Sequence, residues 1–92
     1  IMLEYDEIVY FETMGRKIRV YTYDRMIEFY SNLKEIQEKL DDTFIRCHKS
    51  YLINSRKMKE IDNKQKIIYF EKGLYCFFSA RYSKQLNKLY NK

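Results

Sequence analysis

The chain of 92 residues contains no proline and no tryptophan, only two glycines and two cysteines, and a single histidine. Two cysteines are too few for a disulfide-stabilised secreted scaffold and are typical of a reducing cytosol. No apolar run approaches the roughly 18–20 residues that cross a bilayer, and the acidic first residues are unlike a secretory signal. We therefore expect residues 1–92 to form one cytoplasmic domain without a membrane partner.

The residues that are abundant are aromatic and charged. Ten tyrosines and six phenylalanines within a 46% apolar composition indicate a chain that folds. The net charge of +5 is unevenly distributed: residues 1–45 hold 6 basic and 10 acidic residues, a net of −4, and residues 46–92 hold 12 and 3, a net of +9. This asymmetry suits a polyanion that approaches from one side, although a solvated lysine-rich surface has the same composition.

Short runs of alternating apolar and polar residues predict a mainly β fold of short antiparallel sheets. Glycines at two turns, Gly15 and Gly73, supply the positive φ that tight hairpins need. Asp62–Gln65 is expected to be another turn. The expected strands or strand edges are residues 8–11, 18–22, 26–30, 44–45, 51–53, 58, 61, 67–70 and 75–78.

Two segments change to a helical period. Leu33, Ile36 and Leu40 predict a short internal helix over about residues 31–40, capped by Ser31 or Asn32; with Asn32 as the cap, Glu35 completes a capping box. A second short helix is expected over about residues 82–90, where Tyr82, Leu86 and Leu89 share one face and Ser79 is a plausible cap.

The sequence shows no set of residues that would form a catalytic site. Cys47 and His48 are adjacent, so in a strand their side chains point to opposite faces and do not form a nucleophile–base pair. Together with Cys76 they lack the number and the spacing of zinc ligands, and there is no glycine-rich phosphate loop. We expect no catalytic residue, no metal and no cofactor.

The basic residues gather at predicted turns and strand junctions. Arginine pairs with guanine, while lysine, serine, asparagine and histidine bind phosphates or base edges. A β-rich nucleic-acid-binding protein must use such turns, and its binding should depend strongly on salt. Two alternatives stay open: RNA or single-strand binding with tyrosines as stacking platforms, and a basic protein-interaction module. The clusters are Arg16-Lys17, Arg46 with His48 to Ser50, Asn54 to Lys57, and Arg81 with Lys84.

The stretch from Phe44 to Asn54, FIRCHKSYLIN, resembles the signature of the LytTR family of DNA-binding domains, roughly F-x-R-x-H-[RK]-S-[YF]-[LV]-[VI]-N. Segments 6–12, 31–35 and 79–82 fit the family pattern in the same order, so the resemblance covers nearly the whole chain. It implies the output domain of a bacterial response regulator. The resemblance also implies an elongated assembly of short sheets, whose loops enter successive major grooves of direct-repeat promoter sites.

The resemblance also implies roles for individual residues. Base contacts are expected from Lys49 and Arg81, and from Arg16 and Lys17 in the first hairpin. Phosphate contacts or loop support are expected from His48, Ser50, Asn54, Arg56, Ser79 and Lys84. His48 has an alternative role in satisfying backbone groups beside a strand break, and asparagine at position 54 is also a common turn former. The implied partner is promoter DNA bound by two copies, with RNA polymerase as a further candidate.

Two features depart from the family pattern. The family domain normally has a strand upstream of the one containing residues 1–3, and a receiver domain usually precedes it. The chain is therefore expected to be a fragment with an edge that another segment can pair with. Cys47 and Cys76 flank the presumed DNA-contacting loops and are candidates for a redox pair. The alternative is two half-buried thiols that act as small hydrophobes.

Overall fold

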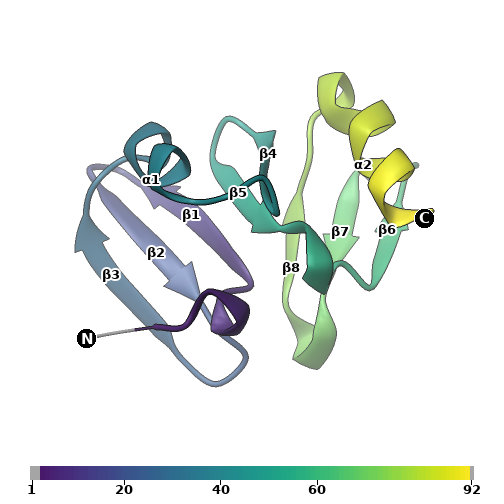
Figure 1. The fold of residues 1–92 in the computed structure, drawn as a ribbon. Coiled ribbons are helices and arrows are strands. Elements are labelled where there is room, and N and C mark those ends of the chain that lie inside the picture. Colours follow the sequence, from purple (N-terminus) through teal and green to yellow (C-terminus); the bar gives the residue numbers. More distant parts are fainter. Residues whose placement is uncertain (1–2, 92) are drawn as a thin grey trace.

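The structure is a computed structural model that describes residues 3–91. The strands form two antiparallel sheets, a larger one in the order β3-β2-β1-β5-β4 and a smaller one in the order β6-β7-β8 (Figure 1). The larger sheet contains β1 (Tyr10–Met14), β2 (Lys17–Tyr21), β3 (Met26–Tyr30), β4 (Phe44–His48) and β5 (Tyr51–Asn54). The smaller sheet contains β6 (Glu60–Asp62), β7 (Ile67–Tyr69) and β8 (Tyr75–Phe77), and the helices are α1 (Leu33–Lys39) and α2 (Ser83–Tyr90).

One face of the larger sheet packs against α1. Successive side chains of a strand point to opposite faces, so Phe11 of β1 and Leu52 of β5 lie on the same face and both join Leu33 of the helix. This helix–sheet core consists of Ile8, Phe11, Ile18, Val20, Leu33, Phe44 and Leu52, all buried. The side of α1 that carries Leu33 therefore packs in the hydrophobic core.

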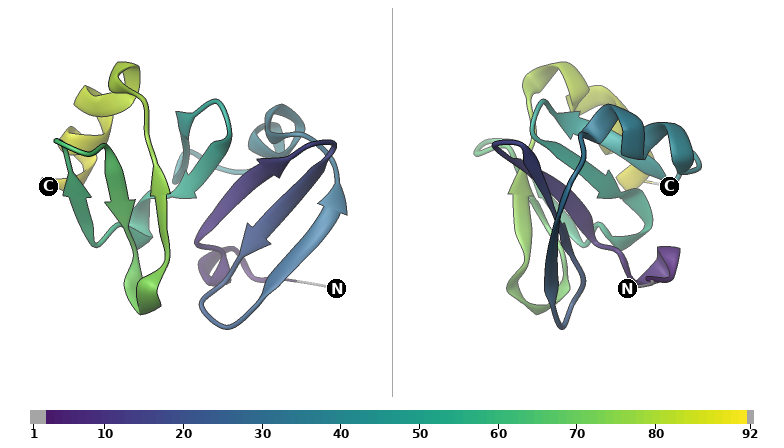
Figure 2. Two further views of the ribbon diagram at one scale, coloured as in Figure 1. Left: turned by 180° about the vertical axis from the view of Figure 1, so that it is seen from behind. Right: turned by 90° about the vertical axis from the view of Figure 1, so that its left-hand side faces the viewer.

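The opposite face of the larger sheet packs against the smaller sheet and α2 (Figure 2). The residues that alternate with the first set, such as Tyr10, Ile45 and Ile53, supply this side. The inter-sheet core consists of Val9, Tyr10, Ile45, Cys47, Ile53, Ile68, Phe70, Cys76, Phe78 and Leu86. Because β1, β4 and β5 are buried on both faces, they are the rigid centre from which the turns project.

The mainly β prediction and both short helices are confirmed, with ends within two residues of the expected ones. Gly15 and Gly73 have the positive φ values of 62° and 79° that their turns require. Asn32 is the cap of α1, and its side chain accepts the Glu35 N–H at 2.9 Å. The Glu35 carboxylate binds the side-chain amide of Asn32 at 2.9 Å, not its backbone N–H, so the predicted capping box takes a different form.

Several local predictions were wrong. The first strand begins at Tyr10, and Thr22 lies beyond β2, where its buried hydroxyl accepts the N–H groups of Asp24 and Arg25 in the turn. Met58 follows a 3-10 turn over Ser55–Lys57 and is not in a strand. Ser79 makes no side-chain capping bond, because a 3-10 turn over Ala80–Tyr82 separates it from α2.

The molecule measures 34 × 24 × 23 Å along its principal axes, so it is moderately elongated. In the described part of the chain, neither helix has the length and apolar character needed to span a bilayer.

Candidate nucleic-acid interface

The turn between β4 and β5 is shaped by a β-bulge. Arg46 pairs with Leu52 and His48 pairs with Tyr51, which leaves Cys47 as an extra residue on β4. Hairpins with two-residue turns usually need positive φ values that match the strand twist, but neither Lys49 nor Ser50 has one. The bulge increases the local twist and frees the Cys47 carbonyl from the strand ladder.

Two side chains hold this turn from within. The Arg46 guanidinium donates from Nε to the His48 carbonyl at 3.1 Å and from Nη2 to the Lys49 carbonyl at 2.9 Å. The Nδ1 atom of His48 accepts the Ser50 N–H at 3.0 Å, which requires this nitrogen to be unprotonated. Arg46 and His48 therefore position the turn, while Lys49, directly after His48, is exposed.

Two backbone hydrogen bonds join this turn to two other segments. The Thr13 N–H at the end of β1 donates to the Ser50 carbonyl at 2.9 Å. The Ser79 N–H donates to the bulged Cys47 carbonyl, also at 2.9 Å. The β1–β2 turn, the β4–β5 turn and the segment before α2 consequently lie along one side of the molecule, the upper side in Figures 1 and 2. We call residues 14–17, 48–51 and 79–84 the basic edge.

The basic edge carries cations that are free to bind a ligand. Arg16, Lys49, Arg81 and Lys84 are exposed, and none of them forms an ion pair within residues 3–91. The guanidinium of Arg81 lies 5.0 Å from the centroid of the Tyr82 ring, which restrains it without neutralising its charge. Four unpaired positive charges thus lie on three connected segments.

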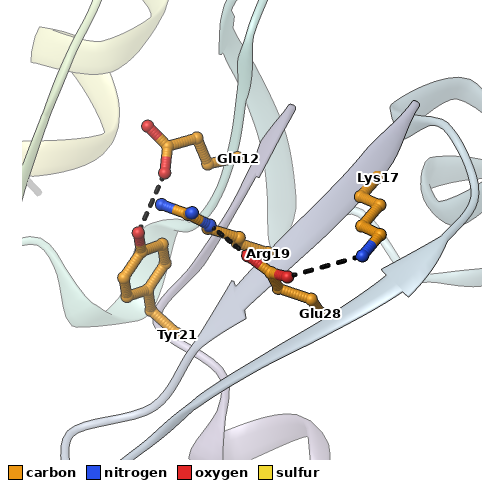
Figure 3. Close-up of polar contacts among 5 residues, drawn as sticks. All are labelled: Glu12, Lys17, Arg19, Tyr21 and Glu28. Carbon is orange, nitrogen blue, oxygen red and sulfur yellow. Dashed lines mark hydrogen bonds and ion pairs between the residues drawn. The ribbon is translucent and has the colours of Figure 1, made fainter. Parts of the chain in front are cut away.

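Lys17 differs from its neighbour Arg16. Its Nζ lies 3.8 Å from the Glu28 carboxylate, as Figure 3 shows, and 5.3 Å from the centroid of the Tyr30 ring. Glu28 also binds Arg19 at 2.6 Å. Of the two predicted base-reading residues of the first hairpin, Arg16 is free and Lys17 is already engaged with β3.

Asn54 and Arg56 lie away from the basic edge, at the opposite end of β5. Asn54 is 3% exposed, and its side chain donates to the Ile8 carbonyl at 2.9 Å and accepts the Arg56 N–H at 3.0 Å. Arg56 lines a pocket of about 240 Å³ together with Asp6 and Asp41. The structure therefore gives Asn54 a supporting role and places Arg56 beside it, apart from the predicted site residues of the basic edge.

Two features of this side were missed in the sequence. Arg46 was grouped with the basic clusters but given no role, although its third position in the signature was a usable signal. The β6–β7 turn carries Lys64 and Lys66, and the Lys66 carbonyl accepts the Phe78 N–H at 3.0 Å, directly before Ser79. These lysines extend the positive charge beside the basic edge.

The two cysteines lie beneath the basic edge in the inter-sheet core. Both are free thiols and fully buried, and the Cys47 thiol donates to the Phe77 carbonyl at 3.5 Å. Burial raises the pKa of the Cys76 thiol well above its ordinary value, and the neighbouring Cys47 raises it further. Cys76 therefore lies close to Cys47 and keeps its proton, a state of low thiol reactivity.

Known proteins resemble this chain over almost its full length. The family model of the LytTr DNA-binding domain matches residues 1–91. Accessory gene regulator protein A is 41% identical in Staphylococcus epidermidis and 39% in Staphylococcus aureus, each over 88 residues, which are 94% of this chain and 37% of the relative. The chain therefore spans little more than a third of these relatives.

A solved structure supports the same assignment at the level of the fold. The LytTr DNA-binding domain of a putative methyl-accepting/DNA response regulator from Bacillus cereus has a TM-score of 0.85, with 24% identity. The alignment covers 100% of this chain and 88% of that one. The chain belongs to the LytTR family of DNA-binding domains, which is not a family of enzymes.

Proposed function

We propose that the basic edge binds a specific sequence of double-stranded DNA and that the chain is the output domain of a bacterial transcriptional regulator. The observation that carries this proposal is the pair of backbone hydrogen bonds, from Thr13 to Ser50 and from Ser79 to Cys47, that hold three basic segments together. Because the backbone of these segments is already held in place, it loses little entropy on binding, which favours a defined DNA geometry over diffuse attraction.

The proposed roles follow the exposure of each side chain. Lys49, Arg81 and Arg16 read base edges, and Lys17 joins them when DNA displaces Glu28. Ser50, Ser79 and Lys84 bind phosphates, and His48 supports the turn. The longest dimension of the molecule is 34 Å, close to the roughly 34–36 Å between equivalent grooves one helical turn apart. This size supports contacts with successive major grooves from one copy.

The wider role rests on the relatives. Accessory gene regulator protein A is named as a regulator, and the Bacillus cereus structure is described as part of a DNA response regulator. We propose that this domain likewise works within a longer response regulator and binds direct repeats as two copies, with RNA polymerase as a further partner.

The pairing of Cys47 and Cys76 as a redox switch is a separate hypothesis. Their contact in the inter-sheet core supports it, because the Cys47 carbonyl and the residues after Cys76 both lead into the basic edge. A disulfide there would strain the two segments that the Ser79–Cys47 hydrogen bond joins.

Direct selection tests the main proposal. The chain is used to select duplexes from a randomised pool, and binding of the selected duplex is compared with a scrambled duplex and with each single strand across a salt series. We expect preference for the selected duplex, with log K falling by about 0.9 for each phosphate contact per unit of log salt concentration. Equal affinity for single strands would support the alternative of single-strand binding. Absence of binding at low salt would instead support the alternative of a basic protein-interaction module.

Arg81→Ala and Arg56→Ala form a matched pair in the same assay. Loss of a base-reading arginine costs about 1–3 kcal/mol of discrimination at one base pair, so Arg81→Ala should accept substitutions there. Arg56→Ala removes the same charge from outside the basic edge and should alter specificity little. Equal effects of the two variants would contradict the assigned interface.

A further inference from the structure

A second cleft lies on the face of the larger sheet opposite α1, where that face meets strand β8. It has a volume of about 230 Å³ and includes Gly73 and Leu74 in its wall. Its other lining residues are one carboxylate and five aromatic side chains: Glu12, Tyr10, Tyr21, Tyr51, Tyr75 and Phe77. Tyr51 also follows the β4–β5 turn within the basic edge, but no residue of the cleft is among the proposed base and phosphate contacts.

In the part of the chain that the structure describes, the carboxylate of Glu12 is bound only by neutral donors. The Tyr21 hydroxyl donates to Oε1 at 2.9 Å, as Figure 3 shows, and the Tyr51 hydroxyl donates to Oε2 at 3.2 Å. Within residues 3–91, Glu12 takes part in no ion pair. Hydroxyl donors stabilise a carboxylate without cancelling its charge, so the cleft keeps a net negative charge.

The cation opposite Glu12 in the sheet is held by another carboxylate. Arg19 lies opposite Glu12 in the register of β1 and β2, and it contacts the Tyr21 hydroxyl. Its Nε, however, is 2.6 Å from the Glu28 carboxylate on β3. Figure 3 shows Arg19 between the two acidic residues. Glu28 thus keeps Arg19 from pairing with Glu12 and leaves the cleft carboxylate available.

Aromatic rings form the walls around this charge. Tyr75 and Phe77 project from β8 with their rings at 87° and 5.9 Å apart, and both are exposed. The Phe77 ring also lies 6.5 Å from that of Tyr51. Ring faces carry negative quadrupole potential and attract organic cations. Burial and the charge of Glu12 raise the pKa of Tyr51, so its hydroxyl stays a neutral donor.

We propose that this tyrosine cleft binds a compact organic ammonium ion, with Glu12 as the counter-ion and the rings of Tyr51, Tyr75 and Phe77 against its alkyl groups. A water molecule occupies about 30 Å³ of liquid, so the cleft has room for an ammonium group with several attached carbons. The inference is independent of DNA binding.

Choline is a suitable probe, because 3,3-dimethyl-1-butanol has the same shape without the charge. Titration of the full chain, followed by the ring resonances of Tyr51 and Tyr75 in NMR spectra, should show saturable binding of choline and much weaker binding of the alcohol. Butylammonium, which mimics a lysine side chain, is titrated in parallel. Tighter binding of butylammonium would indicate that the site binds a lysine of a partner protein. Tighter binding of choline would indicate that it binds a free quaternary ammonium compound. Either result supports an ammonium site.

Three variants make the test specific. Glu12→Gln keeps one hydroxyl bond at its amide oxygen and can donate from its amide nitrogen to the other hydroxyl; the loss of charge should weaken choline binding about tenfold. Glu28→Gln lies outside the cleft but frees Arg19, so it should also weaken binding. Glu38→Gln makes the same charge change on an exposed position of α1 and should have no effect. Unchanged affinity in a folded Glu12→Gln protein, equal binding of the alcohol, or no saturable shift would overturn the proposal.

Discussion

Arg46 places a positive charge beside the basic edge but uses its donors within the protein. Its guanidinium spans two consecutive carbonyls, those of His48 and Lys49. A planar guanidinium fits such a pair, whereas the single ammonium of lysine does not hold both in the same geometry. Arg46 is therefore a positioning residue, whose charge matters less than its shape.

Arg46→Lys tests this assignment because the charge is retained. We expect about tenfold weaker binding to the selected duplex, an effect of about 1.4 kcal/mol, since the β4–β5 turn is less well held. Amide hydrogen exchange at Ser50 should become faster in the same variant.

Arg25→Lys is the control for this prediction. Arg25 is exposed in the β2–β3 turn, at the end of β2 away from the basic edge. The Arg25→Lys substitution should leave both the affinity for the selected duplex and the amide exchange at Ser50 unchanged. Slower or equal exchange at Ser50 in the Arg46→Lys protein would contradict the positioning role.

The hairpin of β4 and β5 works as a unit with two different ends. At one end the bulge at Cys47 exposes a carbonyl that Ser79 uses. At the other end Asn54 connects the hairpin to the segment before β1: its backbone N–H donates to Val9 and its side chain to Ile8. The same short element thus anchors the N-terminal segment and presents the DNA-facing turn.

Asn54→Ala should unfold the domain more easily. The change removes the acceptor of the Arg56 N–H and the donor to the buried Ile8 carbonyl. A buried polar group left without a partner costs about 1–3 kcal/mol, which for a domain of this size lowers Tm by roughly 4–8 °C per kcal/mol. Thermal unfolding followed by circular dichroism measures the effect.

Asn63→Ala is the matched control. The Asn63 amide exchanges hydrogen bonds with that of Asn87, but it is exposed, so water replaces the lost bonds. Its Tm should fall much less. Similar losses in the two variants would show that burial of Asn54 does not determine its contribution.

At the scale of the whole molecule, the cations of the basic edge lie on the surface, whereas several tyrosines and both thiols lie in or against the inter-sheet core. Burial raises the pKa of Tyr10, which is 6% exposed, and neighbouring groups including Tyr21, Cys76 and Glu12 raise it further. The pKa values of Tyr21 and Cys76 are raised as well, again chiefly by burial.

These shifts predict a loss of stability at alkaline pH. In the unfolded chain the groups ionise near their ordinary values of 9.0 for cysteine and 10.0 for tyrosine, whereas in the folded protein they hold their protons to higher pH. The contribution of these groups to the free energy of unfolding is complete below about pH 9. It is lost as the pH rises towards their raised pKa values in the folded protein. Urea unfolding at neutral pH and at about pH 10.5 should show the decline, and Tyr51→Phe should reduce it. A constant free energy of unfolding would contradict the shifts.

Much of this architecture can be predicted from local sequence patterns. The strand-forming runs, the helical spacing of Leu33, Ile36 and Leu40, and the need for positive φ at Gly15 and Gly73 are properties of neighbouring residues. The segment from Phe44 to Asn54 likewise indicated the family without coordinates. The strand wrongly assigned to Met58 follows a turn in which the Asn54 side chain binds the Arg56 N–H and redirects the backbone.

Spatial grouping was decided by tertiary structure alone. Nothing in the spacing of Arg16, Lys49 and Arg81 shows that hydrogen bonds of Thr13 and Ser79 gather their segments on one side, or that Arg56 lies elsewhere. The pairing of Lys17 with Glu28 depends on strand register in the same way. Local patterns determine which elements form, because propensity and turn chemistry act over a few residues. Which charges stay free depends on long-range packing, which places distant residues within hydrogen-bonding reach.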